Sequence, residues 1–177
     1  METERLIIRK PLITDLDDFY EFAKSPNVGP LAGWNYHKSK KESLNELKRY
    51  IASTEYYMIY LKNEDKVIGS ISLINESVIN KHLNNFELGY VLNENYWNKG
   101  YMSEAVKEII RYAFNDLKAN KIVTGHSDDN LVSKKIILNN NFKYKYTDNN
   151  PLYENRNIKK VIMYELKKEE VLLWSLI

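Results

Sequence analysis

The chain has 177 residues, of which 44% are hydrophobic and 28% charged, and this composition is typical of a globular protein with one core. Its formal net charge of +2, with lysine spread along the whole chain, gives no argument for a nucleic-acid partner. The absence of cysteine excludes disulfides and thiolate metal sites. The histidines His37, His82 and His126 lack the spacing of metal ligands, so we expect no metal.

We expect no signal peptide at the start of the chain and no membrane-spanning stretch within it. The opening residues, Met-Glu-Thr-Glu-Arg, lack the basic and apolar regions of a signal peptide. The longest apolar stretch, residues 171–177, is far too short to span a bilayer. We therefore expect a cytoplasmic protein with no membrane partner. The apolar tail at residues 171–174 either packs on the chain's own sheet or covers a second copy in a homodimer.

The first third of the chain predicts a strand followed by two helices. Residues 6–8 are apolar and β-branched, as in a strand. Thr14 is expected to cap a short helix, which ends before a loop at residues 25–33 rich in proline and glycine. Ser39 and Glu42 have the spacing of a capping box and predict a second helix.

Strand-like segments dominate the rest of the chain, interrupted by two helices and by a polar connector at residues 75–84. The predicted strands are residues 56–61, 66–73, 86–92, 121–124, 142–146 and 158–166. The first helix has one apolar face, made of Met102, Val106, Ile109, Ile110 and Ala113. The second helix spans residues 130–140, with Leu131, Ile136 and Ile137 among its apolar positions. This order predicts a mixed α+β fold in which helices cover one sheet.

Residues 87–105 are the most informative run of the sequence. They read as a strand, then a turn with a single glycine, Gly100, and then the start of an amphipathic helix. This order directs unpaired backbone N–H groups and the positive end of a helix dipole to one point. Such a point is suited to phosphate or pyrophosphate.

Three segments, residues 4–9, 87–105 and 130–142, together resemble the GNAT superfamily of N-acetyltransferases over nearly the whole chain. The loop at residues 28–34 resembles a loop of the bacterial ribosomal-protein N-terminal acetyltransferases, the nearest group. The resemblance implies one GNAT domain over residues 1–177. It also implies a mostly antiparallel sheet of about six to seven strands, with a splayed central pair and about four helices. Acetyl-CoA is then the expected co-substrate.

In that superfamily, a Gln/Arg-x-x-Gly-x-Gly/Ala loop binds the pyrophosphate of acetyl-CoA through main-chain N–H groups. The matching residues here, with the serine that follows, are Trp97, Asn98, Lys99, Gly100, Tyr101, Met102 and Ser103. Only Gly100 is kept, so the other replacements matter mainly if their side chains crowd the phosphates. The pantetheine arm is expected to pair with the strand residues Tyr90, Val91 and Leu92.

Asn130 and Ser133 match the superfamily's Asn-x-x-Ser/Ala segment, in which the asparagine contacts the pantetheine arm. Taken alone, Asn130 reads as a helix N-cap, and the two roles are compatible. Lys99, Lys134 and Lys135 either meet the cofactor phosphates or are ordinary surface lysines.

The implied reaction is direct attack of an amine on the acetyl-CoA thioester, with an N–H near Val91 as the donor to the thioester oxygen. The position of the superfamily's tyrosine acid is Ile137, which cannot donate a proton. Ser133, one turn earlier, is the candidate donor to sulfur, or else a simple polar helix residue. Glu87 is the first candidate base and His126 the second. Each also has a structural alternative, and solvent can replace both.

The acceptor site is expected from the first two helices and the loops at residues 29–37 and 148–156. Trp34, Tyr36 and His37 either form an aromatic wall there or pack internally. The resemblance favours a protein N-terminal amine as acceptor. A polyamine or aminoglycoside acceptor, and a module that binds acyl-CoA without catalysis, remain alternatives.

Overall fold

A computed structural model describes residues 1–75, 84–149 and 160–172. The chain forms two compact units, each built from two stretches of sequence. Unit 1 contains residues 1–72 and 90–108, and unit 2 contains residues 73–89 and 109–177. Strand β4 (Asn85–Leu92) and helix α3 (Tyr101–Asn115) therefore contribute residues to both units.

Three antiparallel strands form the sheet portion of unit 1. They are β1 (Leu6–Arg9), β2 (Tyr56–Leu61) and β3 (Lys66–Asn75), of which β3 belongs to unit 1 as far as Ser72. The turn between β2 and β3 contains Asp65 at φ 52°, a left-handed conformation that aspartate adopts more readily than most residues. The three strands agree with the predicted ranges to within two residues.

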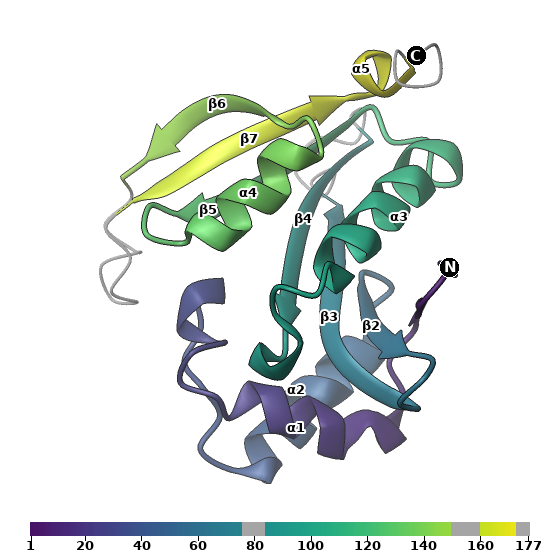
Figure 1. Cartoon of the computed structure of the whole chain (residues 1–177), viewed down its shortest axis with the longest axis vertical. Helices are drawn as coiled ribbons and strands as arrows, with labels where there is room; N and C mark the ends of the chain where they lie inside the picture. Colours follow the sequence, from purple (N-terminus) through teal and green to yellow (C-terminus); the bar gives the residue numbers. More distant parts are fainter. Residues whose placement is uncertain (76–83, 150–159, 173–177) are drawn as a thin grey trace. The chain divides into compact units, whose positions relative to one another are not determined.

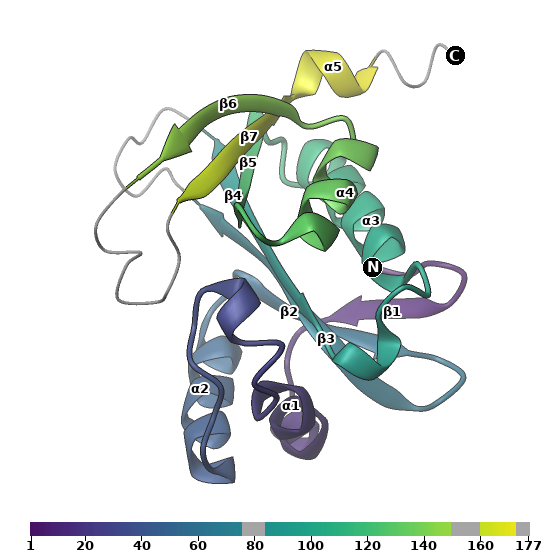
Figure 2. The ribbon, with the colours of Figure 1, turned by 60° about the vertical axis from the view of Figure 1, so that its left-hand side comes forward.

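Two helices, α1 (Leu16–Ala23) and α2 (Lys40–Ala52), lie side by side in unit 1 (Figures 1 and 2). Ser39 caps α2 as predicted, because its hydroxyl accepts the N–H of Glu42 over 3.3 Å. The Glu42 carboxylate accepts the N–H of Lys38 rather than that of Ser39, so the reciprocal half of the capping box is shifted by one residue.

The predicted N-cap at Thr14 is wrong. A 3₁₀ turn, η1 (Ile13–Asp15), precedes α1, and Thr14 lies inside it. The Asp15 carboxylate instead accepts the N–H of Leu12 over 2.7 Å, which fixes the start of this turn. The physical reason is that an aspartate one residue later competes for the capping role and also pairs with Arg9.

The core of unit 1 lies between the two helices and the sheet. Its buried members are Phe19, Phe22, Val28, Leu47, Met58 and Val67. Partly buried residues packed against this cluster include Trp34, Tyr50, Val91 and Trp97. Val91 and Trp97 belong to the end of β4 and the turn before α3, so the core holds the segment that carries the predicted anion site.

The described residues of unit 2 form four strands, two helices and the C-terminal part of α3. Besides the start of β4, its elements are β5 (Lys121–Ser127), α4 (Leu131–Asn139), β6 (Lys143–Asp148), β7 (Val161–Lys167) and α5 (Lys168–Leu172). β4 and β5 are parallel, whereas β5–β7 and β7–β6 are antiparallel. Helix α4 lies along β5, and β7 lies between β5 and β6 (Figure 1).

The strand order is β1-β2-β3-β4-β5-β7-β6, a seven-stranded mixed sheet with five α-helices in the described residues. The predicted fold class is therefore confirmed. The parallel ladder of β4 and β5 covers only residues 85–87 and 121–123. Just beyond it, the Thr124 hydroxyl donates to the Leu88 carbonyl over 2.9 Å in place of a backbone bond. The fifth helix, α5, was not expected.

Helix α4 ends in a Schellman motif. Asn141 has φ 59°, its N–H donates to the Leu138 carbonyl over 3.0 Å, and the N–H of Phe142 reaches the Ile137 carbonyl over 3.4 Å. This confirms Asn141 as a left-handed cap. Of the apolar positions of α4, Leu131 is 67% exposed, whereas Ile137 is buried together with Ser133.

Most of the predicted polar connector at residues 75–84, the start of the last predicted strand and the end of the apolar tail lie outside the described residues. Within the described residues, no helix combines the length and apolar character needed to cross a membrane.

Candidate functional site

In unit 1, the turn from β4 into α3 contains two left-handed residues, Asn98 at φ 61° and Gly100 at φ 81°. The N–H of Glu104 donates to the Gly100 carbonyl over 3.0 Å and closes the first turn of α3. The N–H groups of residues 101–103 precede this bond, and such groups have no acceptor within their own helix. With the positive end of the helix dipole, they can bind an anion.

The conformation of Gly100, rather than crowding, requires a glycine. A Cβ atom added there would lie 3.4 Å from Arg5 Nη2, a contact that a flexible side chain can relieve. A left-handed φ, however, is strained for other residues. A left-handed residue followed by a helical one also turns successive N–H groups to one side, an arrangement that binds anions.

Two bulky side chains of this loop, those of Trp97 and Met102, pack inward. Met102 is buried in the core, and Trp97 packs on the unit 1 core while its indole N–H donates to the Leu92 carbonyl over 2.8 Å. Asn98 and Lys99 are exposed. The replacements at the superfamily's Gln/Arg and small-residue positions therefore leave the main chain of this turn accessible.

The end of β4 is held close to β3 by a glycine. A Cβ atom at Gly69 would lie 2.4 Å from the Val91 carbonyl oxygen, so only glycine allows this approach. The N–H of Asn93 donates to the Ile68 carbonyl over 2.8 Å at the same place. These contacts fix the strand residues Tyr90, Val91 and Leu92, which were predicted to pair with pantetheine.

In unit 2, the first turn of α4 holds the predicted Asn-x-x-Ser segment. The side-chain oxygen of Asn130 accepts the N–H of Ser133 over 3.0 Å, so the N-cap interpretation is confirmed. Ser133 is largely buried, and Ile137, at the superfamily's tyrosine position, is fully buried in the core. Lys134 and Lys135 are exposed on α4.

The register of β4 shows which face of unit 2 carries Glu87. Phe86 pairs with Ile122, and both are buried, whereas Glu87 pairs with Val123, which in turn pairs with Glu165 of β7. Since side chains alternate along a strand, Glu87, Val123 and Glu165 share the face opposite to Phe86 and Ile122. The Glu87 side chain is exposed there.

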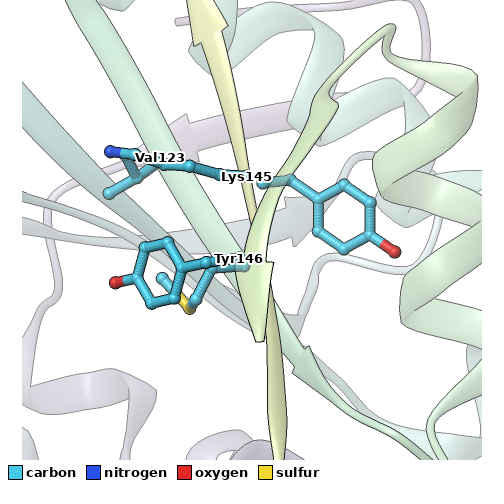
Figure 3. Close-up of a pocket in the computed structure, with 5 residues that line it drawn as sticks. Val123, Lys145 and Tyr146 are labelled. Atoms are coloured by element: carbon cyan, nitrogen blue, oxygen red, sulfur yellow. The ribbon is translucent and has the colours of Figure 1, made fainter. Parts of the chain in front are cut away.

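A pocket of about 50 Å³ lies on unit 2 (Figure 3). It is lined by Val123, Lys145, Tyr146, Met163 and Tyr164. In Figure 3, the Val123 and Tyr146 side chains extend to the same side of the strands. Beside the pocket, Lys145 Nζ lies 3.2 Å from Glu165 Oε2. A space of this size holds about one or two water molecules and is too small for a nucleotide cofactor.

His126, the second candidate base, is a structural histidine. Its ring is buried, Nδ1 lies 2.7 Å from the Ser127 carbonyl oxygen, and Nε2 lies 3.2 Å from the Tyr164 hydroxyl. A neutral ring with its proton on Nδ1 satisfies both contacts, because Nε2 then accepts from the tyrosine. Among the described residues, no three His, Asp or Glu side chains gather as a metal site would require.

The loop expected to meet the acceptor packs partly on the unit 1 core. The rings of Trp34 and His37 are 5.2 Å apart, and those of Phe19 and His37 are 5.9 Å apart. His37 Nδ1 is 2.7 Å from the Ser43 hydroxyl oxygen, and burial lowers the pKa of His37. Tyr36 is exposed. Trp34 and His37 are thus packing residues at least in part, and the later loop lies mostly outside the described residues.

Sequence reasoning missed two residues beside the α3 turn, Arg5 and Glu104, which form a close ion pair. They are far apart in sequence, so no local pattern connects them. The available signal was a glutamate in the first turn of a helix predicted to bind an anion, since the carboxylate would repel that anion unless a cation lay nearby.

The acetyltransferase (GNAT) domain model matches residues 5–143 of the chain. An uncharacterised N-acetyltransferase, YnaD of Bacillus subtilis (strain 168), is 30% identical over 137 residues, which cover 76% of this chain and 77% of that protein.

Solved structures share the fold. A GNAT acetyltransferase from Bacillus anthracis has a TM-score of 0.86 at 21% identity and covers 96% of this chain and 99% of its own. The ribosomal-protein-S5-alanine acetyltransferase of Vibrio fischeri has a TM-score of 0.76 at 22% identity, and the match covers 96% of this chain and 97% of that protein. A spermidine N-acetyltransferase chimera from Vibrio cholerae has a TM-score of 0.74 at 15% identity, and the match covers 96% of this chain and 99% of that protein. The two Vibrio proteins are named for different acceptors, so the fold alone does not identify the acceptor.

Proposed function

The chain belongs to the GNAT acetyltransferase family, whose co-substrate is acetyl-CoA, and we propose that it acetylates a protein N-terminal amine, such as that of a ribosomal protein. We further propose that residues 1–177 act as one catalytic domain in the cytoplasm. The family model supports a single domain, because its match at residues 5–143 includes parts of both compact units.

The observation that carries the proposal is the turn from β4 into α3. Its two left-handed residues, Asn98 and Gly100, and the N–H groups of residues 101–103 suit the pyrophosphate of acetyl-CoA. The pantetheine amides are proposed to pair with the main chain of Tyr90, Val91 and Leu92, and with the side chain of Asn130. Because Asn130 uses its oxygen as the cap of α4, its amide N–H₂ group is the part that can donate to pantetheine.

In the proposed reaction, the amine nitrogen attacks the thioester carbon, the C–S bond breaks and CoA leaves as a thiolate. Glu87 accepts the proton that the amine loses, directly or through water, since its carboxylate is exposed. The Ser133 hydroxyl donates a hydrogen bond to the thiolate sulfur, which is then protonated from solvent. Ile137 takes no part, because it is a fully buried apolar residue.

The acceptor assignment rests on the resemblance of the N-terminal segment and the 28–34 loop to the ribosomal-protein group, and on the fold shared with the Vibrio fischeri enzyme. The likeness to the spermidine enzyme chimera keeps a small-amine acceptor as the second candidate.

The test is release of CoA thiol from acetyl-CoA with three acceptor classes: peptides with a free N-terminal alanine or serine, spermidine, and an aminoglycoside. The matched control for each peptide is the same peptide with a blocked N-terminus and a free lysine side chain. Turnover only with free N-termini supports the proposal. Turnover only with the small amines assigns the second candidate, and thermal stabilisation by CoA without turnover on any acceptor indicates a binding module.

A further inference from the structure

Glu104 occupies an unfavourable position for a protein that binds pyrophosphate at the start of α3. Its carboxylate lies in the first turn of that helix, beside the N–H groups proposed to hold the diphosphate. A lone carboxylate there would repel the ligand and compete for the positive end of the helix dipole. The glutamate is partly buried, so solvent screens it incompletely.

The N-terminal segment surrounds this carboxylate with donors. The Thr3 hydroxyl and the Arg5 backbone N–H both donate to Glu104 Oε1, over 2.5 and 3.0 Å. The Arg5 guanidinium donates to Oε2 through Nε and also places Nη2 at 2.7 Å from it. Burial raises the pKa of Glu104, but these hydrogen bonds outweigh burial and lower it overall. Glu104 is thus held as a paired anion.

Arg5 also reaches the main chain of the turn itself. Its Nη1 donates to the Lys99 carbonyl over 3.0 Å, and its guanidinium lies 4.4 Å from the centre of the Tyr101 ring. In a trans peptide, the carbonyl and the following N–H point in opposite directions. By holding the Lys99 carbonyl on its own side, Arg5 therefore turns the Gly100 N–H to the other side.

We propose that Arg5 is a positioning residue for the pyrophosphate of acetyl-CoA, a role that rests on the proposed function. It orients the Lys99–Gly100 peptide so that the Gly100 N–H joins those of residues 101–103. It also cancels the charge of Glu104, so that the start of α3 stays positive. Arg5 itself faces the loop from the side of the N-terminal segment, since Glu104 and Lys99 already engage its donors.

The test compares a thioester with phosphates and one without. Arg5→Ala should raise the Kd for CoA about tenfold or more, as expected for loss of charge-assisted hydrogen bonds. Its KM for S-acetyl-N-acetylcysteamine, which has no pyrophosphate, should change less than about twofold. Arg5→Lys keeps the charge but cannot contact Glu104 and Lys99 at the same time as the arginine fork does. Its Kd for CoA should therefore lie between those of the unaltered protein and Arg5→Ala. Arg49→Ala, which breaks an exposed Arg–Glu pair in the same unit, is the matched control and should leave the Kd unchanged.

The double variant Arg5→Ala/Glu104→Gln separates the two roles of Arg5. Removing the carboxylate should recover only part of the CoA affinity, because no side chain then orients the Lys99–Gly100 peptide. Full recovery would overturn the orienting role, and equal losses for both thioesters in Arg5→Ala would overturn the proposal as a whole. If the unaltered protein fails to bind CoA, the proposed function fails. If it binds and Arg5→Ala binds equally well, only this inference fails.

Discussion

Two glycines of unit 1 share almost the same left-handed backbone, with φ 82° at Gly33 and φ 81° at Gly100. Alanine at either position should cost about 1 kcal/mol of unfolding free energy, because its Cβ disfavours this conformation. Only Gly100→Ala should also weaken CoA binding, since relaxation of φ turns the N–H that faces the pyrophosphate. Urea unfolding measures the first effect and calorimetric titration with CoA the second. Equal CoA affinity in both variants would argue against the proposed phosphate site.

Substitutions at the two residues proposed to take part in the reaction, Ser133 and Glu87, should lower turnover without changing the affinity for CoA. Ser133→Ala removes a hydroxyl but leaves the Ser133 N–H on its Asn130 cap, so α4 should keep its stability. We expect kcat to fall about tenfold, the effect of one lost charge-assisted hydrogen bond, with the Kd for CoA unchanged. Glu87→Gln should lower kcat most at low pH and little where the free amine already predominates. Unchanged turnover in both variants would favour a solvent-only mechanism.

At the scale of elements, the junction of β1 and α1 depends on one buried carboxylate. Asp15 is 4% exposed and accepts two hydrogen bonds from the Arg9 guanidinium, over 2.9 and 2.7 Å, besides the N–H of Leu12. The hydrogen bonds to Asp15 raise the pKa of Arg9. Removing the charge of Asp15 would leave the partly buried Arg9 guanidinium without its carboxylate partner.

We therefore expect Asp15→Asn to lower the unfolding free energy by about 2–3 kcal/mol, somewhat below the usual cost of breaking a fully buried pair. Asp17→Asn is the matched control, because Asp17 pairs with Lys40 on the surface with its own side chain 81% exposed. That exposed pair should contribute less than about 0.5 kcal/mol. Denaturant unfolding of both variants measures the difference, and similar losses would show that Asp15 has no special role.

The elements that the sequence predicts well are those specified by local chemistry. Apolar spacing located the strands, and Ser39 and Asn141 marked helix ends through their own side chains or backbone preferences. Local patterns failed where a residue distant in sequence determines which side chain makes a hydrogen bond. Asp15 displaced Thr14 from the capping role, because Arg9 holds the Asp15 carboxylate.

The residues of the candidate site likewise fall into those that local sequence predicts and those that it does not. Gly100 and the Asn130–Ser133 segment were identified because glycine and an asparagine cap have recognisable local signatures. The Arg5–Glu104 pair was not, since 99 residues separate its members and either residue alone is an ordinary surface charge. The close approach of Gly69 to Val91 was equally invisible, because it depends on the distance between two strands.

For the whole molecule, low pH should reduce stability mainly through unit 1, where hydrogen bonds between separate segments depend on several titratable side chains. Burial raises the pKa of Glu21, but hydrogen bonds from Lys66 and Asn93 outweigh it and lower the pKa overall. Hydrogen bonds from Ser25 and Asn27 lower the pKa of Glu94. With Glu104, three carboxylates that connect separate segments of unit 1 are thus stabilised in their charged form.

His37 adds an earlier step to the acid response. Burial lowers its pKa below the ordinary 6.5, although the Glu46 and Glu42 carboxylates act in the opposite direction. As pH falls below 6.5, the unfolded chain gains this proton before the folded chain does, so stability decreases. The three carboxylates act later, because the unfolded chain takes up their protons from the ordinary value of 4.5 downward, whereas the folded chain resists.

We therefore predict that the unfolding free energy falls in two stages, a shallow loss below pH 6.5 and a steeper loss below pH 4.5. Urea titrations at closely spaced pH values measure the profile. His37→Gln should flatten the first stage and leave the second, whereas Glu104→Gln should reduce the slope of the second stage only. CoA affinity should weaken only at a pH below the start of the second stage, where Glu104 of the folded protein itself becomes protonated and no longer holds Arg5 against the Lys99 carbonyl. An affinity that is lost with the first stage instead would show that His37, and not the Arg5–Glu104 pair, controls the cofactor turn.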